Sequence, residues 1–178
     1  MLFIPNSTWL NCVNCQLEAE EKIVVRHAKR EDAPQFLGLL VELANFEHLD
    51  PPGPAARRRI VRDTFERKKL ELLLSFVNKR AVGYALFFYT YSSFLARPTL
   101  YLEDLFVSEE FRRRKIGKTL FMSCVKEASK KGCGRMEWSV LTWNKNAIEF
   151  YEKAGARRLS EWYYYRLDSK ALDRLVNK

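Results

Sequence analysis

The chain has 178 residues, of which 47% are hydrophobic, enough for one domain whose core needs neither disulfides nor a structural metal. Lys and Arg exceed Asp and Glu by 31 − 22 = 9, so the chain attracts anions. No apolar run approaches the ~18 to 20 residues of a membrane span, and the opening residues lack the basic start and apolar core of a secretory signal. We therefore expect a cytoplasmic protein without membrane segments.

Residues 1–21 show no clear periodicity, so we expect an N-terminal extension before a folded domain at residues 22–178. Cys12 and Cys15 form a Cys-x-x-Cys pair, which can supply half of a zinc site. A closed zinc site needs four ligands, and no second pair follows. We expect reduced thiols and no metal.

The first expected elements are a strand and two helices. A β-branched run predicts a strand at Lys22–His27, and the Pro-Pro-Gly-Pro run at 51–54 ends the helix that follows. The core face of that helix is marked by apolar residues at helical spacing: Phe36, Leu39, Leu40, Leu43 and Phe46.

The second predicted helix, from Ala55 to about Lys69, is rich in arginine. Its arginines are either a solvated helix face or a contact for an anionic ligand or partner. Both interpretations stay open at this point.

The rest of the chain alternates strands and helices. Two aromatic-rich runs joined by Asn78-Lys79-Arg80 predict a β-hairpin, and Ser92–Pro98 is a loop. The order predicts a mixed α and β protein, in the α/β (α+β) class, with one central β-sheet flanked by helices. The expected strands are Leu70–Val77, Ala81–Tyr91, Thr99–Val107, Met136–Leu141 and Arg157–Leu167, and the expected helices are Arg114–Lys131, Asn144–Ala154 and Ser169–Asn177.

The stretch from Leu100 to Lys118 organises the chain. It runs from an apolar strand through a polar turn and four consecutive cations, Arg112 to Lys115, into a helix that contains Gly117. A helix N-terminus offers unpaired N–H groups and the positive end of a dipole, which suits a phosphate or pyrophosphate. The cations also suit nucleic acid, but the strand, turn and helix favour a nucleotide-like cofactor.

This stretch resembles motif A of the GNAT superfamily of N-acetyltransferases, except that Lys115 stands where the first glycine of the motif is expected. Residues Trp143–Ala156 resemble motif B of the same superfamily, with an Asn, an Ala and a Phe-Tyr pair before a basic residue and a glycine. The resemblance covers roughly Ile23–Asp168 and implies the GNAT fold, acetyl-CoA as cofactor and acetyltransferase activity.

By this resemblance, the backbone of Leu105, Phe106 and Val107 would pair with the pantetheine arm, while Asn144 and Ala147 would line the cofactor channel. Tyr151 would donate a proton to the leaving thiolate, although it can also be an ordinary core tyrosine. The pyrophosphate would be held by the loop and first helical turn, namely Arg112, Arg113, Arg114, Lys115, Ile116, Gly117 and Lys118.

Within the superfamily, the chain is most similar to the spermidine/spermine N-acetyltransferases and their thialysine-acetylating relatives. The shared segments are Val41–Ala44, Tyr89–Tyr91 and Leu100–Val107. An alkylammonium has a pKa near ~10 and must lose a proton before it attacks a thioester, so a carboxylate is needed near the site. Glu103 is the candidate base, and the carboxylates available to bind the amine are Glu47, Glu103, Asp104 and Glu137.

The predicted function is acetyl transfer from acetyl-CoA, by direct attack, to a primary amine of a small molecule such as a diamine, polyamine or thialysine. Where the polyamine enzymes carry Asp-Pro-Trp, this chain has Ser92-Ser93-Phe94, and its net charge of +9 opposes a polycation. A protein N-terminal or lysine acetyltransferase is the first alternative, and a non-catalytic module that binds coenzyme A or nucleic acid is the second. We expect a homodimer, and no nucleic acid partner.

Overall fold

The computed structural model describes residues 22–177, which fall into two compact units divided after Trp138. The first unit holds the β-sheet and most of the core, and the second holds two short helices. Cys12 and Cys15 lie outside the described residues. None of the helices within residues 22–177 combines the length and apolarity needed to cross a bilayer.

The first unit is built on one five-stranded sheet in the order β1-β2-β3-β4-β5. Neighbours from β1 to β4 are antiparallel, and β5 runs parallel to β4. Asn78 and Lys79 both take positive φ in the tight β2–β3 turn, as predicted for a hairpin. The strands are β1 (Ile23–His27), β2 (Glu71–Val77), β3 (Arg80–Ser92), β4 (Arg97–Val107) and β5 (Arg135–Glu137).

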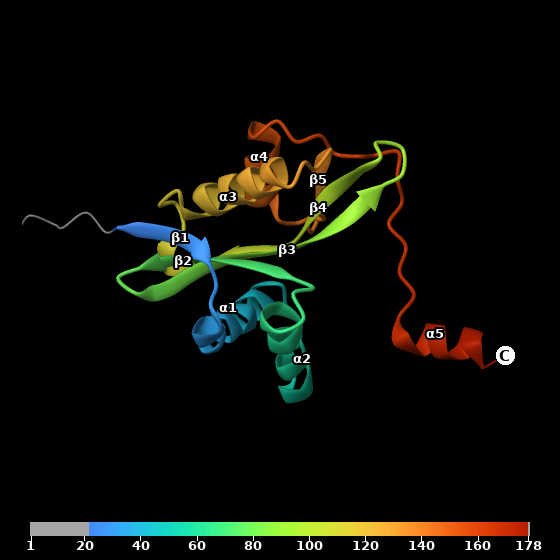
Figure 1. The fold of residues 1–178 in the computed structure, drawn as a ribbon, viewed down its shortest axis with the longest axis horizontal. Coiled ribbons are helices and arrows are strands. Elements are labelled where there is room, and N and C mark those ends of the chain that lie inside the picture. The colour runs from blue at the N-terminus through green and yellow to red at the C-terminus, as the bar shows by residue number, and fades with distance from the viewer. Residues whose placement is uncertain (1–21, 178) are drawn as a thin grey trace, which may run out of the picture. The chain divides into compact units, whose positions relative to one another are not determined.

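Helices cover both faces of this sheet, as Figure 1 shows. Helices α1 (Ala33–Phe46) and α2 (Pro54–Phe65) lie on one face, and a 3-10 turn, η1 (Arg30–Asp32), leads into α1. Helix α3 (Ile116–Lys130) lies on the other face and follows the 3-10 turn η2 (Glu109–Phe111). The observed class, a mixed sheet between helices, confirms the sequence prediction.

Alternation along the strands divides the core between the two faces. Leu72, Leu74 and Phe76 of β2 pack with Phe36 and Leu39 of α1. On the α3 side, Gly83 lets the helix approach β3 closely, because a Cβ there would stand 2.7 Å from the carbonyl oxygen of Phe106 and 3.3 Å from Leu120 Cδ1.

The second unit contains helix α4 (Lys145–Lys153) and helix α5 (Ser169–Val176). The strand predicted at Arg157–Leu167 is wrong: these residues form no strand, and Trp162, Tyr163, Tyr164 and Tyr165 are all at least 74% exposed. Aromatic residues favour strands through packing on a neighbouring strand. Residues 139–177 contain no strand that could provide that packing.

Candidate active site

The strand β4 carries a β-bulge at Glu103. Leu86 of β3 pairs with Asp104, but the next residue, Phe87, pairs with Leu102, so Glu103 is the extra residue of β4. A bulge bends its strand and redirects the side chains around it. The bulge leaves the Glu103 side chain exposed and turns the Asp104 side chain toward Tyr84.

Beyond the bulge, β4 loses its partner on one edge. The parallel pairing with β5 covers only Thr99 to Tyr101, opposite Arg135 to Glu137. From Leu102 to Val107 this edge has no strand partner within residues 22–138. An open strand edge presents backbone N–H and C=O groups that can pair with an extended chain bearing amides. Leu105, Phe106 and Val107, which were expected to bind pantetheine, lie on this open part of β4.

The turn after β4 has the backbone geometry of an anion-binding site. Arg113 and Lys115 both have left-handed backbone, with φ of 62° and 63°, and Lys115 is the N-cap of α3. The N–H of Thr119 bonds to the Lys115 carbonyl at 3.0 Å, but the three preceding N–H groups of the helix find no acceptor within the described residues. Alternating left-handed residues before a helix N-terminus form a concave nest of N–H groups that binds anions.

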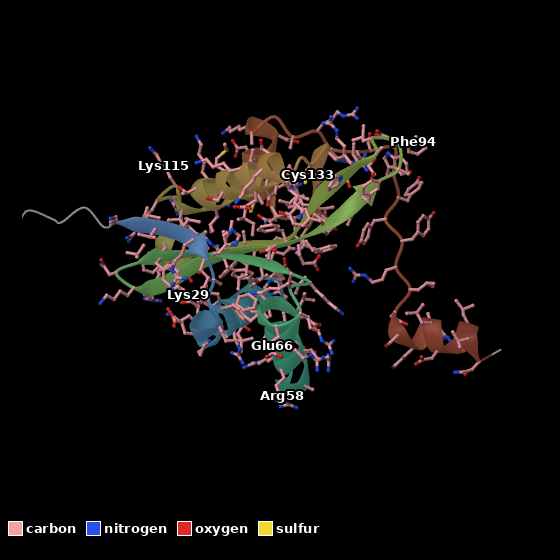
Figure 2. All side chains as sticks on the ribbon, in the orientation of Figure 1. Lys29, Arg58, Glu66, Phe94, Lys115 and Cys133 are labelled. Atoms are coloured by element: carbon pink, nitrogen blue, oxygen red, sulfur yellow. The ribbon has the colours of Figure 1, made fainter. Side chains whose placement is uncertain are left out.

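Lys115 takes the conformation that the missing glycine of motif A would adopt freely. Its side chain is exposed at the start of α3 (Figure 2), so it leaves the backbone N–H groups accessible. Holding a non-glycine residue in this region costs about 1 kcal/mol. The lysine therefore preserves the shape of the loop at a modest energetic cost, and the free N–H groups fit a diphosphate such as that of coenzyme A.

The four consecutive cations are not equivalent. The guanidinium of Arg112 stacks 4.6 Å from the ring centroid of Phe46 and 5.7 Å from that of Phe106, and its Nε donates to the Val107 carbonyl at 3.0 Å. Arg112 thus ties the turn to the core. Arg113, Lys115 and Lys118 are exposed and form no ion pair within the described residues, so their charges are available to an anion.

Carboxylates gather beside the bulge. The Tyr84 hydroxyl, buried in the core, donates to Asp104 Oδ2 at 3.1 Å. The pKa of Asp104 is raised to about 6, chiefly by burial and also by the nearby charges of Glu103 and Glu47, although the Tyr84 hydrogen bond lowers it. Burial also raises the pKa of Glu47, the C-cap of α1. Three of the four expected substrate carboxylates are therefore close together.

Glu137, the fourth expected substrate carboxylate, is not part of this cluster. It lies on β5, where it pairs with Arg135 Nε at 3.0 Å, and it does not contribute to the raised pKa of Asp104. A further acidic contact was missed from the sequence: Ser108, buried directly after β4, donates its hydroxyl to Glu42 Oε2 at 2.6 Å and links the turn to α1.

In the second unit, the motif B residues share one face of α4. Asn144 is the N-cap, and its side chain accepts the N–H of Ala147 at 3.2 Å. Ala147 and Tyr151 follow Asn144 at helical spacing, so the three lie on one side of the helix. Tyr151 is partly exposed, and its ring lies 5.3 Å from that of Phe150.

A family model described as the acetyltransferase (GNAT) family matches residues 33–156. A thialysine N-epsilon-acetyltransferase of Caenorhabditis elegans is 30% identical over 151 residues, covering 83% of this chain and 93% of that protein. An L-ornithine acetyltransferase of Arabidopsis thaliana is 49% identical over 90 residues, covering 51% of this chain but only 40% of that protein.

Solved structures share the fold. An integron cassette protein from V. cholerae superposes with a TM-score of 0.76 at 20% identity, covering 88% of this chain and 98% of that one. AAC(6′)-Iy, solved in complex with the bisubstrate analogue CoA-S-monomethyl-acetylneamine, superposes with a TM-score of 0.70 at 19% identity over 83% of this chain and 99% of that one. The family match and the nearly full-length relatives agree. The chain belongs to the GNAT family of acetyltransferases and is an enzyme that takes its acetyl group from acetyl-CoA.

Proposed function

We propose that this acetyltransferase modifies a primary amine of a small cationic molecule, in the class of thialysine, ornithine or a short diamine. The observation that carries the proposal is the cluster of Glu47, Glu103 and Asp104 beside the bulge of β4. An ammonium group that leaves water needs opposite charges to replace its hydration. The names of the relatives, a thialysine and an ornithine acetyltransferase, support the same class.

In this mechanism, Glu103 and Asp104 bind the ammonium and receive its proton, directly or through water. The free amine must be generated from a group with a pKa near ~10, so a base with a raised pKa is favoured. Asp104 has a pKa of about 6 and is held in place by Tyr84. Glu103 lies exposed on the bulge, where it can meet the incoming substrate.

Acetyl-CoA supplies the thioester from which the acetyl group is transferred. We propose that the N–H groups at the start of α3, with Arg113, Lys115 and Lys118, bind its diphosphate, and that the open edge of β4 at Leu105 to Val107 binds its amide-bearing arm. Arg112, Arg114, Ile116 and Gly117 shape this turn. The resemblance assigns Asn144 and Ala147 of α4 to the cofactor channel. It assigns Tyr151 the role of donating its hydroxyl proton to the leaving thiolate.

The expected homodimer and cytoplasmic location belong to this proposal as well. The homodimer rests on the resemblance to the diamine and thialysine acetyltransferases, and the location rests on the sequence pattern, which shows neither a membrane span nor a secretory signal. Light scattering of the purified chain checks the dimer. A monomer at all concentrations would remove the dimer from the proposal and would not affect the proposed acetyl transfer.

The proposal is tested by thiol release from acetyl-CoA in the presence of single acceptors. The panel contains thialysine, lysine, ornithine, putrescine, spermidine, spermine and short peptides with a free N-terminus or a lysine. We expect turnover with at least one small diamine or basic amino acid and little with the peptides. Turnover with peptides alone would instead establish a protein acetyltransferase, and binding of acetyl-CoA without turnover of any acceptor would indicate a non-catalytic module.

A further inference from the structure

A second charged feature lies apart from the acetyl-transfer residues. A cavity of about 750 Å³ opens between α2 and the start of α1, and none of its lining residues belongs to β4, to the turn before α3 or to the carboxylate cluster. This size is typical of small-molecule sites. The arginine-rich helix that the sequence left unexplained forms one wall.

Helical spacing brings the lining residues together. Ala33, Pro34 and Leu37 lie on one side of α1, directly after Arg30 in η1. From α2 and its C-cap, Glu66, the lining residues are Ala55, Arg57, Arg58, Arg59, Val61, Arg62 and Glu66. Figure 2 shows Arg58 at the end of α2 that lies farther from the sheet. An open, basic depression therefore lies between α2 and the start of α1.

The charges of this cavity are unbalanced. Its lining contains one carboxylate, Glu66, against five guanidinium groups, those of Arg30, Arg57, Arg58, Arg59 and Arg62. The structure gives no carboxylate partner to Arg58 or Arg59 within residues 22–177. Like charges that line one depression repel one another. An anion bound among them would relieve this repulsion.

Arg62 has a side-chain donor without a hydrogen-bond acceptor. Its Nε is buried and has no hydrogen-bond acceptor within the described part of the chain. The Asp63 carboxylate is 3.8 Å from that Nε, beyond hydrogen-bond distance, and it also pairs with Arg67 at 3.4 Å. The Arg62 side chain is 43% exposed, so a ligand would contact the outer part of its guanidinium rather than the buried Nε.

The rest of the lining is apolar. Ala33 and Val61 are buried, and Leu37 is partly buried between the two helices. A simple inorganic anion would make no contact with Pro34 and Leu37, which are the apolar lining residues on α1 that are not fully buried. A ligand that combines an anionic group with an apolar body would use both parts of the cavity.

We propose that this cavity binds a small organic phosphate, in which the phosphate contacts the arginines of α2 and an aromatic or aliphatic body packs on Leu37 and Val61. Guanidinium groups suit phosphate because they donate two parallel hydrogen bonds. Single-stranded nucleic acid is the less favoured ligand, because its binding grooves offer aromatic side chains for base stacking. No aromatic residue lines this cavity.

The test uses 1-naphthyl phosphate as the probe in isothermal titration calorimetry. The protein is first saturated with coenzyme A, so that the anion site at the start of α3 is occupied. We expect 1-naphthyl phosphate to bind one site per chain, and to bind more tightly than either inorganic phosphate or 1-naphthol, because only the ester has both an anionic and an apolar part.

Two variants locate the binding. Arg58→Ala and Arg59→Ala each remove one exposed guanidinium and leave a strong helix former in its place. Each should weaken binding of 1-naphthyl phosphate about tenfold, the loss expected for a hydrogen bond to a charged group. Lys69→Ala, which removes an equal charge at an exposed position outside the cavity, should leave the affinity nearly unchanged.

Three results would overturn the proposal. The first is the absence of probe binding to the protein saturated with coenzyme A. The second is an equal effect of Lys69→Ala and of the two arginine variants, which would mean a non-specific charge effect. The third is tighter binding of a single-stranded oligoribonucleotide than of the organic phosphate, with the same loss in Arg58→Ala, which would assign the surface to nucleic acid.

Discussion

The raised pKa of Asp104 predicts that the charged carboxylate, which the proposed reaction needs as a base, lowers the stability of the folded protein. Its pKa in the folded protein is about 6, against the ordinary 3.8. Below 3.8 the carboxyl is protonated in both the folded and the unfolded chain, and its burial carries no charge penalty. As the pH rises through about 6, the folded protein must hold a charged, partly buried carboxylate, and stability is lost.

The size of this effect follows from the shift. About two pKa units, at roughly 1.4 kcal/mol each, amount to about 3 kcal/mol, which is an upper bound because water reaches part of the side chain. Asp104→Asn removes the charge and keeps an oxygen that can accept the Tyr84 hydroxyl. The variant should therefore be more stable than the wild type above pH 6 by up to about 3 kcal/mol, and equally stable below the ordinary aspartate pKa.

Urea denaturation of both proteins across this pH range measures the difference, and other titrating groups cancel in the comparison. Glu103→Gln is the companion variant: the Glu103 charge contributes to the raised pKa of Asp104, so this variant should reduce the pH-dependent loss of stability in part, whereas Asp104→Asn should abolish it. Asp104→Asn should also lower kcat/KM for the amine about a hundredfold or more, as expected for loss of a general base. A stability difference that does not change with pH would show that folding does not raise the pKa of Asp104.

Three further predictions concern other parts of the site. Tyr151→Phe should lower turnover about a hundredfold with little change in coenzyme A affinity; unchanged turnover would remove its role as proton donor. Lys115→Gly should keep or increase coenzyme A affinity, measured by calorimetry, because glycine adopts the φ of 63° without strain; a large loss would mean that the lysine ammonium contacts phosphate. Gly83→Ala should destabilise the fold by about 1 to 3 kcal/mol in urea, because its Cβ would stand 2.7 Å from the Phe106 carbonyl oxygen; unchanged stability would show that β3 can move away from β4 and α3 there.

Local patterns in the sequence predicted the elements that depend on local signals. The hairpin at Asn78 and Lys79, the apolar stripe of α1 and the cationic start of α3 all appear where propensity and periodicity placed them. The predicted ends were less accurate, since β5 stops at Glu137 rather than at Leu141 and α2 stops at Phe65. Strand ends depend on where the partner strand diverges, which one segment of sequence does not encode.

The features that were missed depend on contacts between distant segments. The bulge at Glu103 exists because β3 and β4 change register beside it, and neither strand shows this alone. The Tyr84–Asp104 hydrogen bond joins residues twenty positions apart. One signal was present in the sequence: a tyrosine on the core face of β3 needs a partner for its hydroxyl, and Asp104 is the acid that provides it.

The cations of the turn show that composition alone does not identify which basic residues are available to bind an anion. Four consecutive basic residues suggested a uniform phosphate site, but Arg112 stacks on Phe46 and Phe106, while Arg113 and Lys115 face solvent. An arginine beside buried aromatic rings is stabilised there by cation–π contact. The sequence places Phe46 sixty-six positions before Arg112, so this contact became visible only in the fold.

The central claim, that the carboxylate cluster of Glu47, Glu103 and Asp104 selects a small molecule with a second cation, is tested most directly by one ratio. The measurement is kcat/KM for 1,3-diaminopropane divided by that for propylamine, which has the same chain and lacks the second ammonium, with acetyl-CoA as donor. We predict a ratio of about ten or more, the value of one charge-assisted contact, and a ratio that falls toward unity in Glu47→Gln. A ratio near unity in the wild-type protein would contradict it.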